Sequence, residues 1–342
     1  MKILIVGDVH WSKTSSILIR RGKSFSLRLE NLINTINWCE ETALSNKCDE
    51  VIYLGDFFDR SDLNAEEITA LKEVNWNNLP HHFIVGNHES GIHTLVYNST
   101  DVLNKPNFKI EYKVNKYELE NTDLYILPYF IEDNRKELKD YLKDYSSSKK
   151  NIIFSHNDLK GIRYGAFESK EGFSLEEINQ YADLFINGHL HNGTWIDKKI
   201  LNLGNITGQN FTEDAFNYKH QIAILDTDTL KIDFIENPYA FNFYKIDINS
   251  KADLVKVDTL KNNAVVSFKC LDRYVEDLKE KLNTASNICE SKTVIHREFT
   301  ENETEEKVEL NNSNYLTQFI SFIHDKLGKS DVVEHELGEV CK

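Results

Sequence analysis

The sequence of 342 residues contains little cysteine and no long apolar run. Its five cysteines, at positions 39, 48, 270, 289 and 341, are far apart and never form a C-x-x-C pair. This pattern argues against a disulfide framework and a zinc ribbon, and is typical of reduced thiols in a cytosol. No window approaches the length of a membrane span, and the four-residue apolar run before Asp8 is too short for a secretory signal. We therefore expect a cytoplasmic protein with no membrane attachment.

Positive charge is also scarce, since the chain has 40 lysines and arginines but 55 aspartates and glutamates, which gives a net charge of −15. This balance is unfavourable for binding nucleic acid alone, because phosphate affinity comes mainly from Lys and Arg. Residues 12–29 differ, because they hold five basic residues and no acidic one: Lys13, Arg20, Arg21, Lys23 and Arg28. Two interpretations are equally favoured, a solvated flexible loop and a segment that contacts phosphate. In the second, the candidate phosphate contacts are Arg20, Arg21 and Lys23.

Neither an internal repeat nor a Pro-rich or Gly/Ser-rich linker is visible, and the first 235 residues alternate between two patterns. Apolar runs typical of strands occupy residues 3–6, 51–54, 82–85, 124–127, 151–154 and 184–186. Helical periodicity occupies residues 28–44, 65–74 and 175–181. Apolar strands between amphipathic helices predict an α/β layered domain with buried sheets.

The pattern changes near residue 244. Strands are expected at residues 244–248, 264–270 and 292–299, and a helix at 274–285, which together indicate a small β-rich domain. An acidic stretch follows, and then residues 313–327 carry large apolar side chains at helical spacing. The predicted division is therefore a main domain over residues 1–243, a small domain over 244–310, and an amphipathic helix and tail over 311–342.

Five polar clusters directly follow five of the predicted strands. They read GDVH at residues 7–10, GDFFDR at 55–60, GNHE at 86–89, SHND at 155–158 and NGHLH at 187–191. In open α/β sheets, ligand sites form outside the carboxyl ends of the strands, so we expect the clusters to converge on one site. Three of them contain Gly-Asp or Gly-Asn, as expected where a strand turns sharply and its polar side chain must reach an ion.

The residue types in these clusters fit one kind of chemistry. Carboxylate, imidazole and amide oxygen are ligands for divalent metal ions, and no thiolate is involved. Two such ions about 3.5–4 Å apart share a carboxylate, activate a bridging water as hydroxide and neutralise the oxygens of a phosphate ester. One D-x-H motif is weak support, because a solvated loop explains most of them. Five clusters in this order, each after an apolar run, indicate a two-metal site.

This ordered set resembles the calcineurin-like metallophosphoesterases over about residues 1–245. Within that superfamily it is most similar to the SbcD nuclease family, including phage recombination endonuclease subunits, through G-D-x-F-D, G-H-x-H, the small second domain and the C-terminal apolar helix. The resemblance implies a layered α-β-β-α phosphoesterase domain with a small α+β capping domain. It also implies a manganese-dependent DNA exonuclease or endonuclease that works in repair and recombination with an SbcC-like coiled-coil ABC-type ATPase, as a homodimer within a heterotetramer.

The resemblance also implies a role for individual residues. One metal ion is held by Asp8, His10, Asp56 and His191, and the other by Asp56, Asn87, His156 and His189, with Asp56 as the bridge. His88 stabilises developing charge or protonates the leaving oxygen, and Asp59 accepts from its other ring nitrogen. For Arg60, a phosphate contact and a surface ion pair stay equally open. The remaining histidines, at positions 81, 82, 93, 220, 296, 324 and 335, are interpreted as satisfied or solvated.

The alternative function is a stand-alone metallophosphoesterase acting on a small phosphodiester, nucleotide or phosphoprotein. Serine/threonine phosphatases share the second and third motifs, whereas G-H-x-H favours the nuclease and phosphodiesterase branches. A non-catalytic scaffold is disfavoured, because every ligand position is filled. Residues 313–327 discriminate between the two enzymes: this helix packs on its own domain or, in the nuclease interpretation, docks on the ATPase. Such a partner would supply much of the DNA-binding surface that this acidic chain lacks.

Overall fold

The structure is a computed structural model that describes residues 1–91, 94–164, 167–213 and 215–297. Residues Met1–His296 form one compact unit. The predicted helix at residues 313–327 lies outside the described residues.

The first sheet has six strands in the order β18-β17-β1-β2-β3-β6. Its parallel strands are β1 (Lys2–Val6), β2 (Glu50–Tyr53), β3 (His81–Ile84) and β6 (Phe108–Glu111). Two antiparallel strands complete one edge, β17 (Gln221–Asp226) and β18 (Lys231–Glu236). The predicted strands at residues 3–6, 51–54 and 82–85 are confirmed to within one residue.

The second sheet also has six strands, in the order β15-β16-β14-β9-β8-β7. Its parallel strands are β8 (Thr122–Leu127), β9 (Lys150–Ser155), β14 (Leu184–Asn187) and β16 (Ile200–Asn202). The antiparallel edge strands are β7 (Asn115–Glu118) and β15 (Thr194–Trp195). The three predicted strands of this sheet are confirmed as β8, β9 and β14.

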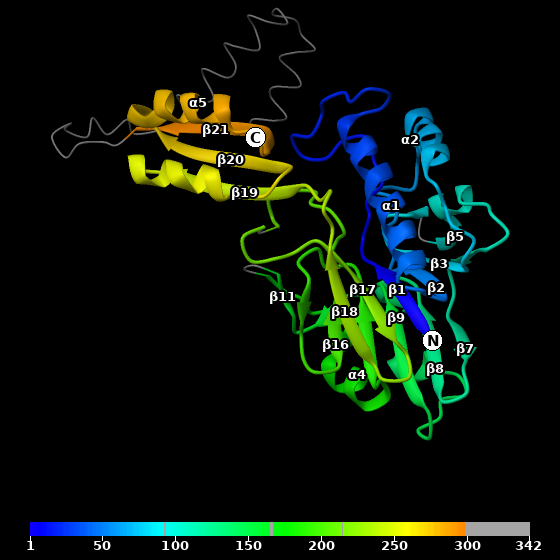
Figure 1. The fold of residues 1–342 in the computed structure, drawn as a ribbon. Helices are drawn as coiled ribbons and strands as arrows, with labels where there is room; N and C mark the ends of the chain where they lie inside the picture. Colours follow the sequence, from blue (N-terminus) through cyan, green and yellow to red (C-terminus); the bar gives the residue numbers. More distant parts are fainter. Residues whose placement is uncertain (92–93, 165–166, 214, 298–342) are drawn as a thin grey trace, which may run out of the picture. The chain divides into compact units, whose positions relative to one another are not determined.

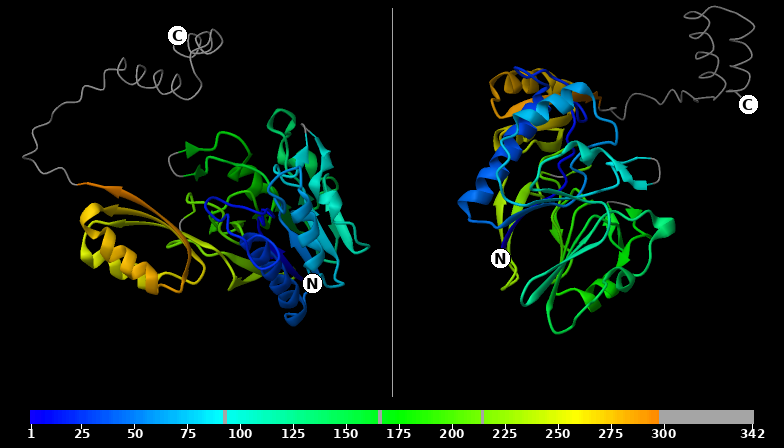
Figure 2. Two further views of the ribbon diagram at one scale, coloured as in Figure 1. Left: turned by 90° about the horizontal axis from the view of Figure 1, so that it is seen from above. Right: turned by 90° about the vertical axis from the view of Figure 1, so that its right-hand side faces the viewer.

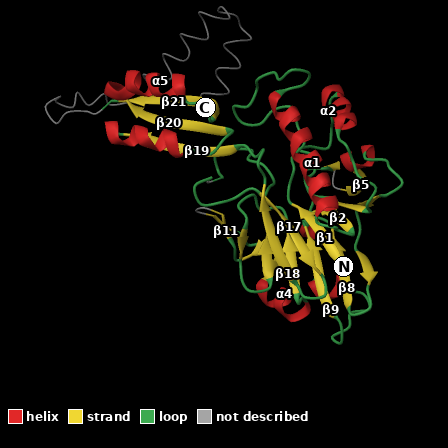
Figure 3. Cartoon of the chain, viewed as in Figure 1, coloured by secondary structure: helices red, strands yellow, loops and turns green. Residues whose placement is uncertain are grey.

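The period-two alternation of the strands produces the layers. Ile3 and Ile5 of β1 pack between the two sheets, while Leu4 and Val6 face helix α1 (Leu27–Ser45) on the opposite side. The outer face of the second sheet is covered by α3 (Leu138–Tyr141) and α4 (Leu175–Tyr181). The main domain therefore has helix, sheet, sheet and helix layers, which confirms the predicted α/β class (Figures 1 and 3).

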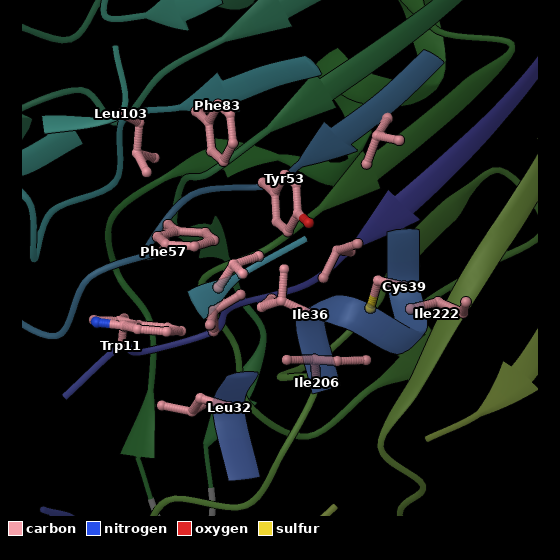
Figure 4. Packing of buried hydrophobic residues seen from close by; sticks show 14 of the residues in the cluster. Trp11, Leu32, Ile36, Cys39, Tyr53, Phe57, Phe83, Leu103, Ile206 and Ile222 are labelled. Carbon is pink, nitrogen blue, oxygen red and sulfur yellow. The ribbon is translucent and has the colours of Figure 1, made fainter. Parts of the chain in front are cut away.

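The layer beneath α1 is rich in aromatic side chains, which Figure 4 shows from close by. Tyr53 stacks on Phe83 at a ring distance of 4.8 Å, and Phe57 packs edge-on against both rings. The indole of Trp11 is fully buried, and its N–H donates to the carbonyl of Glu67 at 3.1 Å. The loops that follow β1 and β2 are thus anchored in the core.

Side-chain caps fix where the helices begin. Ser26 caps α1, and capping boxes pair Asn64 with Glu67 at α2 (Ala65–Ala70) and Ser174 with Glu177 at α4. The helix predicted at residues 65–74 divides into α2 and the 3-10 helix η1 (Leu71–Glu73). Short elements complete the domain: β4 (Ser90–Gly91), β5 (Thr94–Asn98), η2 (Ser99–Val102), η3 (Glu132–Asn134), β10 (Leu159–Lys160), β11 (Arg163–Tyr164), β12 (Phe167–Glu168) and β13 (Phe173–Ser174).

A three-stranded parallel sheet follows the main domain: β19 (Asn242–Ile248), β20 (Ala264–Leu271) and β21 (Ile288–His296). The 3-10 helix η4 (Lys251–Thr259) connects the first two strands, and η5 (Asp272–Tyr274) with α5 (Val275–Thr284) connects the last two (Figure 2). Both crossovers pack on one face through Val257 and Leu278. β19, β20 and α5 confirm the predictions at residues 244–248, 264–270 and 274–285 to within two residues. The strand predicted at residues 292–299 corresponds to β21, which begins four residues earlier, and residues 298 and 299 lie outside the described residues. η4 was not predicted, and the domain boundaries at residues 243 and 310 stay predictions.

Among the helices of the described ranges, none combines the length and the apolarity needed to cross a membrane.

Candidate dinuclear metal centre

The predicted ligands stand on loops that follow five parallel strands. β1, β2 and β3 are neighbours in the first sheet, and β9 and β14 are neighbours in the second. Because neighbouring parallel strands end at the same edge, the loops that follow them lie close together. The structure brings together the side chains of Asp8, His10, Asp56, Asn87, His88, His156, His189 and His191.

Asp8, His10 and His191 form a first group, in which the possible ligand atoms all lie within 4.8 Å of one another. The Nε2 atoms of the two histidines are 3.0 Å apart. On the other side of each ring, Nδ1 of His10 lies 3.2 Å from Oδ1 of Asp59, and Nδ1 of His191 lies 3.0 Å from Oε1 of Glu213. Each carboxylate accepts the Nδ1–H, which leaves the Nε2 lone pair for a metal ion.

Asp56, His156 and His189 form a second group with the same limit of 4.8 Å. Oδ1 of Asn87 lies 3.2 Å from Nε2 of His156 and 3.1 Å from Nδ1 of His189, so it belongs to this group. Oδ2 of Asp56 lies 3.1 Å from Nε2 of His156 and 4.0 Å from Nε2 of His10. Asp56 therefore faces both groups, as a carboxylate shared by two ions must.

His88 and Asp59 are arranged differently from the expectation. Nδ1 of His88 donates to the main-chain carbonyl of Asp59 at 2.7 Å, whereas the Asp59 carboxylate is 4.0 Å away. That carboxylate instead contacts His10 and accepts from Nε2 of Gln209 at 2.5 Å. The physical reason is that the carbonyl already occupies the one Nδ1–H of His88. Asp59 thus orients His88 through its backbone and His10 through its side chain.

Three of the ligands have a strained backbone conformation. His10, Asp56 and His189 have φ angles of 49°, 44° and 75°, a region that only a few per cent of non-glycine residues adopt. Gly55 has a φ of 103°, and a Cβ there would lie 2.3 Å from Nδ1 of His156. A Cβ at Gly86 would lie 2.2 Å from Oδ1 of Asp56. The glycines of these two motifs are therefore required by the close approach of the loops.

The electrostatic environment favours positive charge. Burial alone would raise the pKa of Asp56, but His156, followed by His10 and His88, holds this pKa well below its usual range. Burial would lower the pKa of His156, but the carboxylates, first of all Asp56, raise it to about 10. A proton and a metal ion compete for the same ring nitrogen, so the carboxylates that stabilise one also stabilise the other. For His10 burial dominates and lowers the pKa, which favours the neutral form that ligates metals.

The donor set also passes a direct test of fit. Oδ1 of Asp8 accepts from the backbone N–H of His189 at 3.1 Å. Oδ2 of the same buried carboxylate has no hydrogen-bond partner among the described residues. An unpaired buried carboxylate oxygen is costly, and a cation beside it removes that cost. Oxygen and imidazole donors without thiolate suit manganese, iron, zinc and cobalt.

The basic candidates are all engaged within the protein or exposed. Nη2 of Arg60 is 2.5 Å from the buried carboxylate of Glu67, which favours the ion-pair interpretation. Arg20 pairs with Glu290 of β21 at 2.8 Å, and Arg21 pairs with Glu66 of α2. Lys23 is exposed.

Four supporting residues were not assigned a role from the sequence. Glu89 accepts from the backbone N–H groups of Phe58 and Gly86, which ties two motif loops together. Asp158 lies 3.2 Å from Nε2 of His189. The other two are Glu213 and Gln209, described above. Glu89 and Asp158 stand inside quoted motifs, which is a usable signal, whereas residues 209 and 213 belong to no motif.

Comparison with known proteins identifies the family of this chain. The family model of the calcineurin-like phosphoesterases matches residues 1–193, more than half of the chain. Among curated proteins, Exonuclease subunit 1 of Enterobacteria phage T4 is 23% identical over 249 residues, which cover 69% of this chain and 68% of that protein.

Two solved structures are similar at a lower level. The first is TT1561 of Thermus thermophilus, with a TM-score of 0.41 and 10% sequence identity. The second is a dimetal phosphatase from Danio rerio, with a TM-score of 0.39 and 13% sequence identity. Each match covers 69% of this chain and 98% of the other. On its family match and its α/β fold, this chain belongs to the calcineurin-like phosphoesterases.

Proposed function

We propose that this chain is a metal-dependent DNA nuclease, with exonuclease or endonuclease action, and the nuclease subunit of an SbcCD-like recombination and repair complex. The observation that carries the proposal is the filled ligand set, whose donors lie on five loops around one point. The similarity to a phage protein named an exonuclease subunit supports both the nuclease activity and the need for a partner.

In this proposal Asp8, His10 and His191 hold one ion, Asn87, His156 and His189 hold the other, and Asp56 is shared. Two divalent ions, which we propose to be manganese, would supply Lewis-acid activation of water and neutralise charge on the phosphate.

The chain's own residues have separate tasks. The Asp59 carbonyl accepts Nδ1–H of His88 and so fixes the ring, which turns Nε2 toward the metal ligands, 4.0 Å from Oδ2 of Asp56. The side chain is 39% exposed, so a substrate can reach it. Nε2 of His88 is therefore the group that we assign to donate a proton to the leaving oxygen.

The DNA surface is shared with a partner in this proposal. The net charge of −15 disfavours strong binding of DNA by the chain alone. We propose that an SbcC-like ATPase, bound through residues 313–327, supplies the rest of the DNA-binding surface. The proposed complex is a cytoplasmic heterotetramer that contains two copies of each chain.

The substrate class is tested by manganese-dependent cleavage of linear duplex DNA and single-stranded DNA, compared with hydrolysis of a chromogenic phosphodiester. Replacing Arg20, Arg21 and Lys23 with serine is expected to weaken DNA cleavage. It should also flatten the salt dependence of binding, by about one unit of slope for each phosphate that the variant no longer neutralises. Hydrolysis of the small ester should stay unchanged, because these side chains are not among the predicted metal ligands.

A matched control replaces three lysines that form surface ion pairs elsewhere, Lys139, Lys279 and Lys281, with serine. It removes the same charge and should leave DNA cleavage near the wild-type rate. Equal losses on DNA and on the small ester in the first variant would contradict a role in DNA binding. Hydrolysis of the small ester without any cleavage of DNA would favour the stand-alone phosphoesterase.

The partner is tested by ending the chain at Asn311. Recovery with the coiled-coil ATPase of the same genome in a pull-down is expected to fall at least about tenfold, because the segment proposed to dock on the ATPase is removed. Hydrolysis of the small ester should survive, since all the predicted ligands lie within residues 1–296. Full-length chains carrying Leu316→Asp and Phe319→Asp control for chain length and should show the same loss. Equal recovery of full-length and shortened chains would contradict the docking role.

A further inference from the structure

The carboxylate of Glu213 is a nearly fully buried acceptor beside the first group of ligands. Its Oε1 lies 3.0 Å from Nδ1 of His191 and accepts from Nδ2 of Asn205 at 2.9 Å. The backbone N–H of Gln209 lies 3.2 Å from Oε1 and 2.9 Å from Oε2. A buried carboxylate held by these donors cannot turn away from His191, so it fixes both the ring and its tautomer.

Gln209, four residues earlier, supports the second histidine of the same group. Its side-chain Nε2 donates to Oδ1 of Asp59, and this oxygen lies 3.2 Å from Nδ1 of His10. His10 and His191 are the two histidines whose Nε2 atoms are 3.0 Å apart. One segment, residues 208–213, therefore orients both imidazoles of one metal position.

The other metal position is supported differently. Nδ1 of His156 lies 2.8 Å from the carbonyl of Leu54, at the end of β2, and Nε2 of His189 lies 3.2 Å from Asp158, just after β9. These supports belong to the strand ends that carry the ligands themselves. The two positions thus depend on different parts of the chain.

Residues 208–213 are held in place by a buried arginine and by the chain that enters the small sheet. Arg28, fully buried, donates from Nη1 to the carbonyl of Gly208 at 3.1 Å and from Nη2 to the carbonyl of His10 at 3.3 Å. The N–H of Gly208 donates to the carbonyl of Phe241 at 2.9 Å, directly before β19. Phe241 packs in a cluster with Val265 of β20. The segment is therefore tied to both the first motif and the small domain.

We propose that residues 208–213 form a positioning element for the metal position of Asp8, His10 and His191, with Glu213 as its principal positioning residue. The inference rests on the metal-binding part of the proposed function and is independent of the substrate. The element sets how tightly this one ion is held.

The experiment titrates manganese into the full-length, metal-free chain and measures bound ion by electron paramagnetic resonance. Glu213→Gln is expected to lower the affinity for one of the two ions about 10- to 100-fold and to leave the affinity for the other unchanged. Loss of a carboxylate that supports a metal-bound histidine typically has an effect of this size. Asp158→Asn is the matched control, because it makes the same carboxylate-to-amide change beside His189. It should weaken the other ion.

A double-mutant cycle identifies the ion. If Glu213 acts through His191, Glu213→Gln should have no further effect in His191→Ala and its full effect in His156→Ala. Full effects in both backgrounds, or wild-type affinity for both ions, would overturn the inference. An equal loss of both ions together with a lower melting temperature of the metal-free chain would also overturn it, since that describes a structural residue.

Gln209→Ala provides a second variant, which removes only the hydrogen bond to Asp59. It is expected to weaken the same ion by a smaller factor, and an effect on the other ion would again overturn the inference. Because only metal binding is measured, a chain that binds two ions but does not cleave DNA would contradict the proposed function and leave this inference intact.

Discussion

Replacing Asp56 with asparagine is expected to remove at least one of two divalent ions from the chain and most of the hydrolytic activity. Oδ2 of Asp56 lies 3.1 Å from His156 and 4.0 Å from His10, so the carboxylate faces both groups of ligands. Asparagine keeps the shape but loses the negative charge and one acceptor oxygen, and a neutral amide cannot neutralise two cations. Elemental analysis after reconstitution with manganese, together with hydrolysis of a chromogenic phosphodiester, measures both effects.

The matched control for this variant is Asp123→Asn. Asp123 is equally buried, but it lies near the start of β8 and pairs with Lys116 at 3.0 Å and Lys149 at 3.1 Å. Loss of this carboxylate should lower the melting temperature, because breaking a buried ion pair reduces stability. The variant should still bind two ions per chain. Two fully occupied positions in Asp56→Asn would refute the assignment of Asp56 as the shared ligand.

The sequence contained enough information to predict which side chains gather, because each ligand directly follows an apolar strand. Asp8 comes two residues after β1, and Asp56 three after β2. Once these strands are parallel neighbours, their ends share an edge and the side chains beyond them have little freedom to lie elsewhere. Helix α4 was predictable for a similarly local reason, since Ser174 and Glu177 form a capping box at its start.

Partners within the site could not be predicted in the same way. Asp59 was expected to orient His88 by its carboxylate, yet the carboxylate turns to His10 and the carbonyl serves His88. A backbone carbonyl is present at every residue and leaves no signal in the sequence. Glu213 is 22 residues beyond His191, in a loop without a motif, so only the three-dimensional arrangement shows that the two meet.

The antiparallel edge strand β18 was missed for another reason. β17 and β18 form a hairpin at one side of the first sheet, and in β18, the edge strand, only Ile232 and Ile235 are half-buried while the other side chains are exposed. Such a strand carries a weak apolar signal compared with the buried strands β1 and β2. For Arg60 the sequence left a phosphate contact and an ion pair equally open. Its partner Glu67 also accepts from the backbone N–H of Asn64 in the capping box of α2. One glutamate thus serves both the helix cap and the ion pair.

Replacing His88 with alanine is expected to leave both metal ions bound and to lower the rate of DNA cleavage about 10²- to 10⁴-fold, the usual contribution of a general acid. The loss should be smaller for an ester with an acidic phenol as leaving group, because such a group departs without being protonated. The measurement compares turnover of DNA and of the aryl ester in the wild-type and variant chains, with metal content determined for both.

Asp59→Asn gives the contrasting pattern, because its carboxylate supports His10 while its carbonyl, which orients His88, is retained. The variant should weaken the binding of a metal ion before it changes the ratio of the turnover rates on DNA and on the aryl ester. His88 also stands within 4.8 Å of possible ligand atoms of His10 and Asp56, so a role as a metal ligand is the competing hypothesis. A fall in metal content in His88→Ala, with equal losses on both substrates, would establish that ligand role and exclude the proton donor. If the variant keeps both metal ions and loses activity only on DNA, His88 acts by protonating the leaving oxygen.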